Sequence, residues 1–418
     1  MENEVKAKEI LKRYGQEHII SWMDKLSNNE KEELINQILN LNISQVIDLY
    51  ENLNKTFEIG NKNIEKISAI DISKLSEEEF KKYKIIGEEF IKNSEYAVIT
   101  MAGGQGTRLG HTGPKGTFKI SVNNGDKYLF QIIVESLQKA NEKYDVIIPW
   151  YIMTSEENNN QTLEFLENNN YFGYDKQKVK LFKQGKAPLI STKGKLLIGK
   201  DKLIKEASDG NGSIYQSLAK NGILEDMKQN NIKWVFVGGV DNILLRIVDP
   251  LLIGVTVSEN NEIASKSVIK ITPKERAGVF CKIDEKPGII EYSELPEEMA
   301  EKVDENGDLV YGDVNILSHL FSIDALEKLA KIQLPYHIAE KKSDYLDENG
   351  ILVKPDNKNV YKYESFIFDA FSNFDEMSIL RVKRENEFAP IKNAEGVDSP
   401  ETAVELYNAT HGDGAIGS

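Results

Sequence analysis

The feature that most constrains this sequence is a glycine-rich segment that follows a short apolar run. The run Tyr96–Met101 is rich in β-prone residues and leads directly into Ala102–Gly110, which contains four glycines. Glycine permits positive φ and lets backbone N–H groups approach a ligand without interference from a Cβ atom. The segment is not a Walker A motif, and Leu109 stands where a G-x-G-x-x-G motif needs its last glycine. The pattern predicts a ligand-binding loop that follows a buried strand.

Two cations accompany this loop. Arg108 lies within it, and Lys115 follows shortly afterwards, between Pro114 and Gly116. Taken singly, each could be an ordinary surface charge. Placed together beside glycine N–H groups that no Cβ atom shields, the two cations favour a polyphosphate-binding site.

The rest of the chain indicates an α/β fold. Beyond the loop, apolar strands predicted at 147–154, 180–184 and 234–240 alternate with amphipathic helices predicted at 156–166 and 213–224. Such alternation is typical of βαβ units, so we expect a Rossmann-like, mixed, mainly parallel sheet. Parallel sheets bind their ligands beyond the carboxyl ends of the strands. The residues that follow each strand are therefore the candidates for a site.

The chain is predicted to have three parts. Residues 1–95 form an N-terminal helical segment, because apolar residues such as Leu34, Ile35 and Ile38 recur at helical spacing. We interpret this segment as a helical cap on the next domain. Residues 96–408 form the catalytic domain, and the small, polar residues 409–418 are expected to be a disordered tail.

Composition excludes several classes of protein. A net charge of −15 over 418 residues argues against a general nucleic-acid binder, which needs a basic face. Cys281 is the only cysteine, so an intrachain disulfide is excluded, and such a residue is more often part of a core than a nucleophile. No stretch reaches the roughly 20 apolar residues of a membrane helix. We expect a cytoplasmic protein, and the sequence leaves its oligomeric state open.

A resemblance to a known family becomes specific at this point. Met101-Ala-Gly-Gly-Gln-Gly-Thr-Arg-Leu-Gly110, followed by Pro114-Lys-Gly116, resembles the signature of eukaryotic-type UDP-sugar pyrophosphorylases, and the UDP-N-acetylglucosamine enzymes most of all. The resemblance covers roughly residues 96–408 and continues in order through Leu129-Phe-Gln131, Asp209-Gly-Asn-Gly-Ser-Ile-Tyr215, Val240-Asp-Asn-Ile243, Glu291-Tyr-Ser-Glu294, Val314-Asn-Ile316, Phe366-Ile-Phe-Asp369 and Glu387-Phe-Ala-Pro-Ile-Lys-Asn393.

The resemblance implies a fold of the nucleotide-diphospho-sugar transferase type and a reaction between UTP and a sugar 1-phosphate. This reaction needs no covalent protein intermediate, so cations and a Mg2+-binding carboxylate suffice. The implied catalytic residues are Arg108, Lys115 and Lys392, and Asp241 is implied to hold Mg2+. The implied UTP-binding residues are Ala102, Gly103, Gly104, Gln184 and Gly212. The implied sugar-binding residues are Asn211, Asp241, Gly278, Glu291, Tyr292, Asn315, Phe366 and Phe368.

Several of these residues have simpler interpretations. Gln184 could merely end a strand, and Asp241 could be the N-cap of the segment that follows it. Phe366 and Phe368, predicted to alternate on one face of a strand, could be core residues. The family's Asn-Gly-Gly-Leu-Tyr appears here with Ser213 at its third position. The family's enzymes also continue past the lysine motif into a small C-terminal domain, whose properties the resemblance does not carry over.

The leading hypothesis is uridylyl transfer from UTP to N-acetylglucosamine 1-phosphate, and three alternatives are less favoured. Uridylyltransferases for glucose 1-phosphate tend to carry His-Gly-Asp where this chain has Asn211-Gly-Ser213, which disfavours that substrate. A catalytically silent nucleotide-sugar-binding protein would be expected to lack at least one of the catalytic or metal-binding residues, and all are present. A dinucleotide-dependent dehydrogenase is disfavoured, because the glycine spacing of its binding motif is absent from this chain. No nucleic acid or membrane partner is expected.

Overall fold

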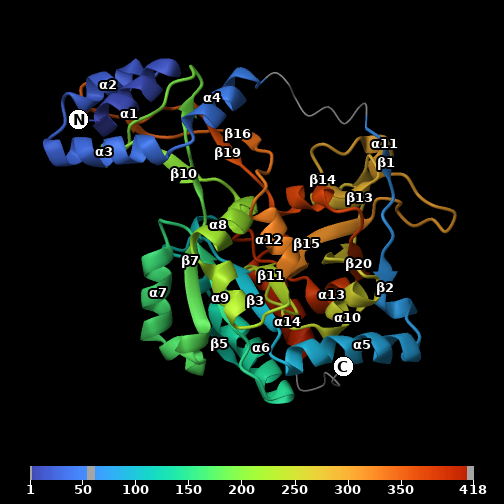
Figure 1. The fold of residues 1–418 in the computed structure, drawn as a ribbon. Coiled ribbons are helices and arrows are strands. Elements are labelled where there is room, and N and C mark those ends of the chain that lie inside the picture. The colour runs from blue at the N-terminus through green and yellow to red at the C-terminus, as the bar shows by residue number, and fades with distance from the viewer. Residues whose placement is uncertain (1, 54–61, 412–418) are drawn as a thin grey trace. The chain divides into compact units, whose positions relative to one another are not determined.

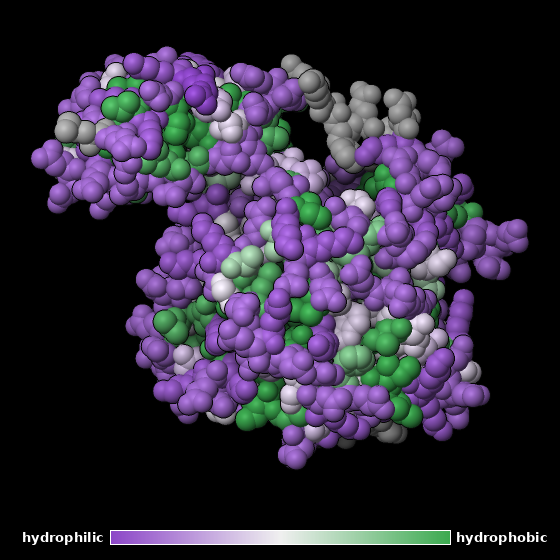
Figure 2. Space-filling view, viewed as in Figure 1, coloured by the Kyte–Doolittle hydropathy of each residue, from purple (hydrophilic) through white to green (hydrophobic). Residues whose placement is uncertain are grey.

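The computed structural model describes residues 2–53 and 62–411, which divide into two compact units. The smaller unit comprises Met1–Gly60, Gly185–Ser213 and Leu334–Ile367, and the larger comprises Asn61–Gln184, Ile214–Gln333 and Phe368–Ser418. Each unit is therefore assembled from separate stretches of the chain, which can be followed by colour in Figure 1. The face shown in Figure 2 is mostly hydrophilic, as expected from a chain with 28% charged residues.

The larger unit is built on a mixed sheet. Its strands are β1 (Ile64–Glu65), β2 (Ile70–Asp71), β3 (Tyr96–Met101), β6 (Trp150–Thr154), β7 (Val179–Lys183), β11 (Trp234–Gly239), β12 (Ile263–Ile269), β13 (Val279–Ile283), β14 (Lys286–Ile290), β15 (Asp313–Ser322) and β20 (Ser378–Arg381). The main order is β2-β20-β12-β15-β11-β3-β6-β7, and β13 branches from β15 to pair with β1 and β14. Along the main order only β15 runs antiparallel to its neighbours. The predicted α/β fold with a mainly parallel sheet is confirmed.

Helices cover both faces of this sheet (Figure 1). The helices of the larger unit are α5 (Glu77–Lys92), α6 (Leu129–Tyr144), α7 (Asn159–Asn168), α8 (Ile214–Lys220), α9 (Ile223–Gln229), α10 (Pro250–Ser258), α11 (Glu297–Ala300), α12 (Ile323–Leu329), α13 (Arg384–Glu387) and α14 (Pro400–His411). On one face, Tyr96 and Val98 of β3 share an apolar core with α5, α6, α10 and α14. On the other, the Tyr151 hydroxyl of β6 donates to Asp226 of α9 at 2.7 Å. A small hairpin of β4 (Lys119–Val122) and β5 (Gly125–Tyr128) precedes α6.

The smaller unit combines helices with short strands. Its elements are α1 (Glu2–Arg13), α2 (Glu17–Met23), α3 (Asn28–Asn40), α4 (Ile43–Glu51), β8 (Lys186–Pro188), β9 (Ile190–Ser191), β10 (Glu206–Ser208), β16 (His337–Lys341), β17 (Tyr345–Leu346), β18 (Leu352–Val353) and β19 (Val360–Glu364). Leu34 and Ile38 of α3 are buried in one core with Ile190 and Tyr363. The helical segment predicted for residues 1–95 thus contributes α1–α4 to this unit and α5 to the larger one.

The strands that lead into the candidate site are those the sequence predicts most closely. The predicted strand 96–101 is β3, and the strands predicted at 180–184 and 234–240 are β7 and β11 within one residue at each end. The strand predicted at 147–154 begins only at Trp150, after Pro149, which has no N–H to donate to a ladder. The helix predicted at 213–224 is divided into α8 and α9 by Gly222, whose φ is 71°.

Two predictions near the C-terminal end of the chain need correction. The prediction that Phe366 and Phe368 lie on a strand is wrong, because β19 ends at Glu364 and Ile367–Asn373 form 3-10 turns. The expected tail begins too early, since α14 continues to His411, and residues 412–418 lie outside the described part of the chain. Among residues 2–53 and 62–411, no helix is long and apolar enough to cross a membrane.

Helices α5 and α10 cross at a contact that admits only glycine. A Cβ atom built on Gly87 would lie 1.8 Å from the carbonyl oxygen of Pro250, and one built on Gly254 would lie 1.8 Å from that of Tyr83. Neither carbonyl belongs to a side chain that could rotate away. The two helices are therefore packed backbone against backbone, and they lie side by side in Figure 1.

Gly254→Ala should destabilise the protein. The new methyl group would force the helices apart, at a typical cost of about 1–3 kcal/mol, and this exceeds the ~1 kcal/mol that alanine gains over glycine in a helix. Denaturant unfolding monitored by circular dichroism measures the difference. Ser258→Ala, an exposed change in the same helix, is the matched control. A Gly254→Ala protein as stable as the parent would contradict the described crossing.

Candidate active site

The site begins where β3 and β11 end. These strands pair in parallel with Met101 opposite Gly239, and the Val240 N–H donates to the Met101 carbonyl at 3.2 Å. Ala102 and Asp241, the residues that follow this last pairing, consequently leave the same edge of the sheet. The sequence predicted functional residues after both strands, and the pairing brings those segments together.

The glycine-rich loop is held in shape by its own hydrogen bonds. The Lys115 N–H donates to the Gly104 carbonyl at 3.1 Å, and the buried Asn158 side chain donates to the Ala102 carbonyl at 2.9 Å. Arg108 lies in a 3-10 turn, Thr107–Leu109, with its side chain exposed. The loop therefore presents its cations from a constrained backbone.

Gly103 and Gln184, both predicted to bind UTP, lie against each other. A Cβ atom on Gly103 would lie 2.8 Å from both the nitrogen and the oxygen of the Gln184 side-chain amide. Gln184 follows β7, and its N–H donates to the Thr154 carbonyl at 2.8 Å. An amide can donate and accept at once, which suits the adjacent carbonyl and N–H groups of a pyrimidine base.

Lys115 and Asp241 form an ion pair at the sheet edge. The Lys115 ammonium lies 3.3 Å from an Asp241 carboxylate oxygen, and both side chains are largely shielded from solvent, at 17% and 24% exposed. The alternative interpretation of Asp241 as a helix N-cap is wrong, because the next helix is α10 and its N-cap is Asp249. Within the described residues, no three His, Cys, Asp or Glu side chains gather into a metal-binding group. Asp241 would therefore hold a cation together with ligands other than these side chains, such as water and substrate phosphates.

Lys392 reaches this edge through backbone pairing. The Ile391 N–H donates to the Asp241 carbonyl at 2.9 Å, and the Ile243 N–H donates to the Ala389 carbonyl at 3.2 Å. The Lys392 ammonium lies 3.6 Å from an Asp398 carboxylate oxygen and is 47% exposed. The segment that carries Lys392 is thus bound directly to the segment that carries Asp241.

Three of the predicted sugar-binding residues also gather. The Asn315 N–H donates to the Gly278 carbonyl at 2.9 Å, and a Cβ atom on Gly278 would lie 2.9 Å from a Glu291 carboxylate oxygen. Any side chain at position 278 would therefore push the carboxylate out of its place. Tyr292 follows Glu291 and is 47% exposed.

Asn315 lies beside a bulge in β15 that the sequence did not predict. The register of β15 against β12 shifts between Ser265 and Ser267, and Leu317 adopts a φ of 56°. The Asn315 side-chain oxygen accepts a hydrogen bond from the Leu317 N–H at 2.9 Å and so supports this unusual backbone. A left-handed leucine carries no sequence signal, because glycine or asparagine is the residue expected in that conformation.

In the smaller unit, Asn211, Gly212 and Phe366 come together. The Gly212 N–H donates to the Ser365 carbonyl at 2.9 Å, and a Cβ atom on Gly212 would lie 2.8 Å from the Phe366 backbone. The Asn211 side chain accepts from the Ile367 N–H at 2.9 Å. Glycine is therefore required at position 212 by the close approach of another backbone.

Asp209 is a titratable residue near this group that the sequence argument missed. It is 7% exposed, and one of its carboxylate oxygens has no hydrogen-bond partner within the described residues. Burial raises the pKa of Asp209 to about 6, although a hydrogen bond from Ser213 favours the charged form. An Asp-Gly pair usually indicates an exposed turn, which is why this burial gave no signal.

The larger unit is thus an α/β fold with a glycine-rich loop and a paired cation and carboxylate at the same edge of its sheet. A family model described as UTP–glucose-1-phosphate uridylyltransferase matches residues 47–413, and the chain belongs to that family. It is accordingly a nucleotidyltransferase of the UDP-sugar pyrophosphorylase type.

Individual relatives agree with this assignment. The chain is 35% identical to the UDP-N-acetylglucosamine pyrophosphorylase of Saccharomyces cerevisiae over 96% of its length and 88% of the relative's. It is 35% identical to the UDP-N-acetylglucosamine diphosphorylase 2 of Arabidopsis thaliana, over 96% and 83% of the two chains. The crystal structure of the Trypanosoma brucei uridine diphosphate N-acetylglucosamine pyrophosphorylase in complex with inhibitor is 28% identical, with a TM-score of 0.84 over 98% and 85% of the chains.

Asp209→Asn should change how stability depends on pH. Folding raises the pKa of Asp209 from 3.8 to about 6, so the folded state binds the proton more tightly. The stabilisation present below pH ~3.8 is lost as pH rises through ~6, and at pH 8 it leaves a cost on the order of 1–3 kcal/mol. The asparagine variant should gain that amount relative to the parent between pH 5 and pH 8, as measured by urea unfolding. Asp48→Asn, at an exposed position of the same unit, should show no such gain.

Proposed function

We propose that this chain joins UTP to N-acetylglucosamine 1-phosphate, giving UDP-N-acetylglucosamine and pyrophosphate. The observation that carries the proposal is the ion pair of Lys115 and Asp241, which lies beside the glycine-rich loop and is backbone-bonded to the segment of Lys392. Such an arrangement offers a carboxylate for a cation, a loop for phosphates, and a separate lysine for a second phosphate.

The reaction is an in-line displacement at phosphorus. An oxygen of the sugar phosphate forms a bond to the α-phosphorus of UTP, and the bond from that phosphorus to the bridging oxygen of the β-phosphate breaks. Arg108 and Lys115 compensate the charge that grows on the phosphoryl oxygens and on pyrophosphate, and Lys392 orients the sugar phosphate. Gly103 and Gln184 receive the uracil. No side chain has to accept a covalent bond.

Asp241 would hold Mg2+. A single carboxylate fits this ion, which usually keeps several waters and takes its other ligands from substrate phosphates. When bound, the ion neutralises phosphate charge. Lys115 pairs with this carboxylate in the described structure, and its ammonium would be released towards the phosphates if Asp241 held the ion.

The choice of sugar rests on two lines of support. Relatives that match nearly the whole chain are named for N-acetylglucosamine. The group of Gly278, Glu291 and Asn315 also offers what an N-acetyl sugar needs. Glycine lets the Glu291 carboxylate lie close against the backbone at position 278. The Asn315 oxygen already accepts from Leu317, so its amide nitrogen is the group that can donate to the acetyl carbonyl. A cytoplasmic location stays a prediction from the sequence.

Asp241→Asn should abolish most of the metal-dependent turnover, by about a hundredfold or more, because a neutral amide is a poor Mg2+ ligand. UTP affinity without metal should be retained or improved, because Lys115 loses its carboxylate partner. Pyrophosphate release across a Mg2+ titration, together with calorimetry of UTP in EDTA, measures both effects. Asp226→Asn, which removes from α9 the carboxylate that pairs with Lys180 of β7, should leave both values unchanged. Normal turnover of Asp241→Asn at limiting Mg2+ would remove Asp241 from the metal site.

A panel of sugar 1-phosphates with UTP, scored by pyrophosphate release, tests the substrate. N-Acetylglucosamine 1-phosphate should exceed glucose 1-phosphate in kcat/KM, because a buried donor left unpaired typically costs about 1–3 kcal/mol. Asn315→Ala and Asn315→Asp should both reduce that preference, since neither can donate to the acetyl group. Asn315→Asp retains the acceptor for Leu317, so a loss in both variants excludes collapse of the bulge as the cause. A preference for glucose 1-phosphate in the parent protein would refute the sugar assignment but not uridylyl transfer.

A further inference from the structure

Asn242 connects the two segments that carry Asp241 and Lys392. It follows Asp241 in the chain, is 7% exposed, and forms an isolated antiparallel bridge with Pro390. Its backbone neighbours already pair with the opposite segment. The side chain adds a second and separate set of bonds.

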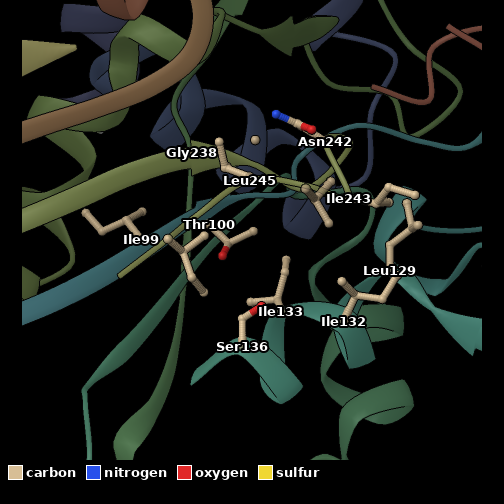
Figure 3. A pocket seen from close by; sticks show the side chains of 13 residues that line it. Ile99, Thr100, Leu129, Ile132, Ile133, Ser136, Gly238, Asn242, Ile243 and Leu245 are labelled. Atoms are coloured by element: carbon tan, nitrogen blue, oxygen red, sulfur yellow. The ribbon is translucent and has the colours of Figure 1, made fainter. Parts of the chain in front are cut away.

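Both the nitrogen and the oxygen of the Asn242 side-chain amide form hydrogen bonds. Its nitrogen donates to the Glu387 carbonyl at 2.7 Å, and its oxygen accepts from the Ala389 N–H at 2.9 Å and from the Leu244 N–H at 3.2 Å. The bond to Leu244 closes a local turn, and the other two cross to the segment before Lys392. In Figure 3 this amide points away from the apolar side chains of Leu129, Ile132 and Ile133 that line the adjoining small cavity.

The far end of this connection is fixed by a buried cluster of charges. The Lys266 ammonium, 0% exposed, lies 2.6 Å from Asp249 and 2.5 Å from the carboxylate of Glu387. Glu387 therefore cannot shift without separating buried opposite charges, which is costly. The backbone carbonyl of Glu387, which accepts from Asn242, is therefore held in place.

We propose that Asn242 is a positioning residue for the transfer reaction, which sets Lys392 relative to Asp241 so that the sugar phosphate and the metal-bound triphosphate meet in line. This inference rests on the proposed function, because it needs Lys392 to bind the sugar phosphate. Side-chain amides that cross-link two segments fix distance and direction together, and misplacement of a reacting group by about 1 Å can cost on the order of a hundredfold in rate.

Asn242→Ser is the variant of choice. The serine hydroxyl can still accept from the Leu244 N–H and close the local turn, but it is too short to reach Glu387 and Ala389. The variant should lower kcat/KM for N-acetylglucosamine 1-phosphate by about tenfold to a hundredfold. The KM for UTP should change by less than about twofold, because the glycine-rich loop is held by its own bonds. Hydrogen exchange at the amides of Ala389 and Ile391 should become faster.

A double-mutant cycle separates positioning from general support of the fold. In a Lys392→Ala background, Asn242→Ser should change kcat/KM for the sugar phosphate by less than about twofold, since the group it positions is gone. Asn141→Ala removes a comparable amide, which joins the Ile148 N–H to the Tyr174 hydroxyl in the same unit, and should leave both kinetic constants unchanged.

The outcomes distinguish this inference from the proposed function. Uridylyl transfer by the parent protein supports the function whatever the variants do. Equal losses from Asn242→Ser in both backgrounds would overturn positioning through Lys392, as would unchanged hydrogen exchange with unchanged kinetics. Full activity of Lys392→Ala would overturn the inference together with the role of Lys392. If Asn242→Ser folds poorly, Asn242→Asp keeps the bonds to Leu244 and Ala389, and in the cycle it should likewise lose its effect when Lys392 is absent.

Discussion

The parallel pairing of β3 with β11 is the constraint on which the candidate site of the larger unit depends. Met101 stands opposite Gly239, so the glycine-rich loop and the segment of Asp241 leave the sheet at the same level. The 3.3 Å approach of Lys115 to Asp241 follows from that register. A slip of one residue would turn Val98 and Phe236, which now face the helices α5, α6 and α10, to the opposite side. The buried apolar pattern of two strands thereby determines the distance between a cation and a carboxylate 126 residues apart.

Where local chemistry decides a structure, the sequence was enough to predict it. The run Tyr96–Met101 could be recognised because β-prone residues lead directly into glycines, and Asp241 because it follows a buried strand. The apposition of Gly103 and Gln184 and that of Gly278 and Glu291 agree with the roles implied by the family resemblance. These contacts bring the predicted residues together, and their roles stay predictions.

Features that depend on distant partners could not be predicted. Phe366 and Phe368 alternate with Ile367 as strand residues do, yet Ser365 is already engaged by Asp209 and Gly212, and the strand ends before it. The bulge at Leu317 is supported by the Asn315 side chain, and the resulting backbone shape has no sequence pattern of its own. In each case tertiary hydrogen bonds override the local preference of the chain.

The cluster around Lys266 shows what such distant partners contribute. Its three members come from β12, the N-cap of α10 and the end of α13, and the Arg246 guanidinium, 4.0 Å from Glu387, supplies a second positive charge. Burial raises the pKa of Glu387 while Lys266 opposes that rise. Buried ion pairs of this kind seldom add net stability over apolar packing, because desolvation offsets the attraction. Three apolar side chains in these places, however, could slide past one another, whereas charged groups that pair at 2.5–2.6 Å cannot. The Glu387 carbonyl accepts a hydrogen bond from the Asn242 amide, so the fixed position of Glu387 also restrains the segments of Asp241 and Lys392. For those two side chains, orientation matters more than added stability.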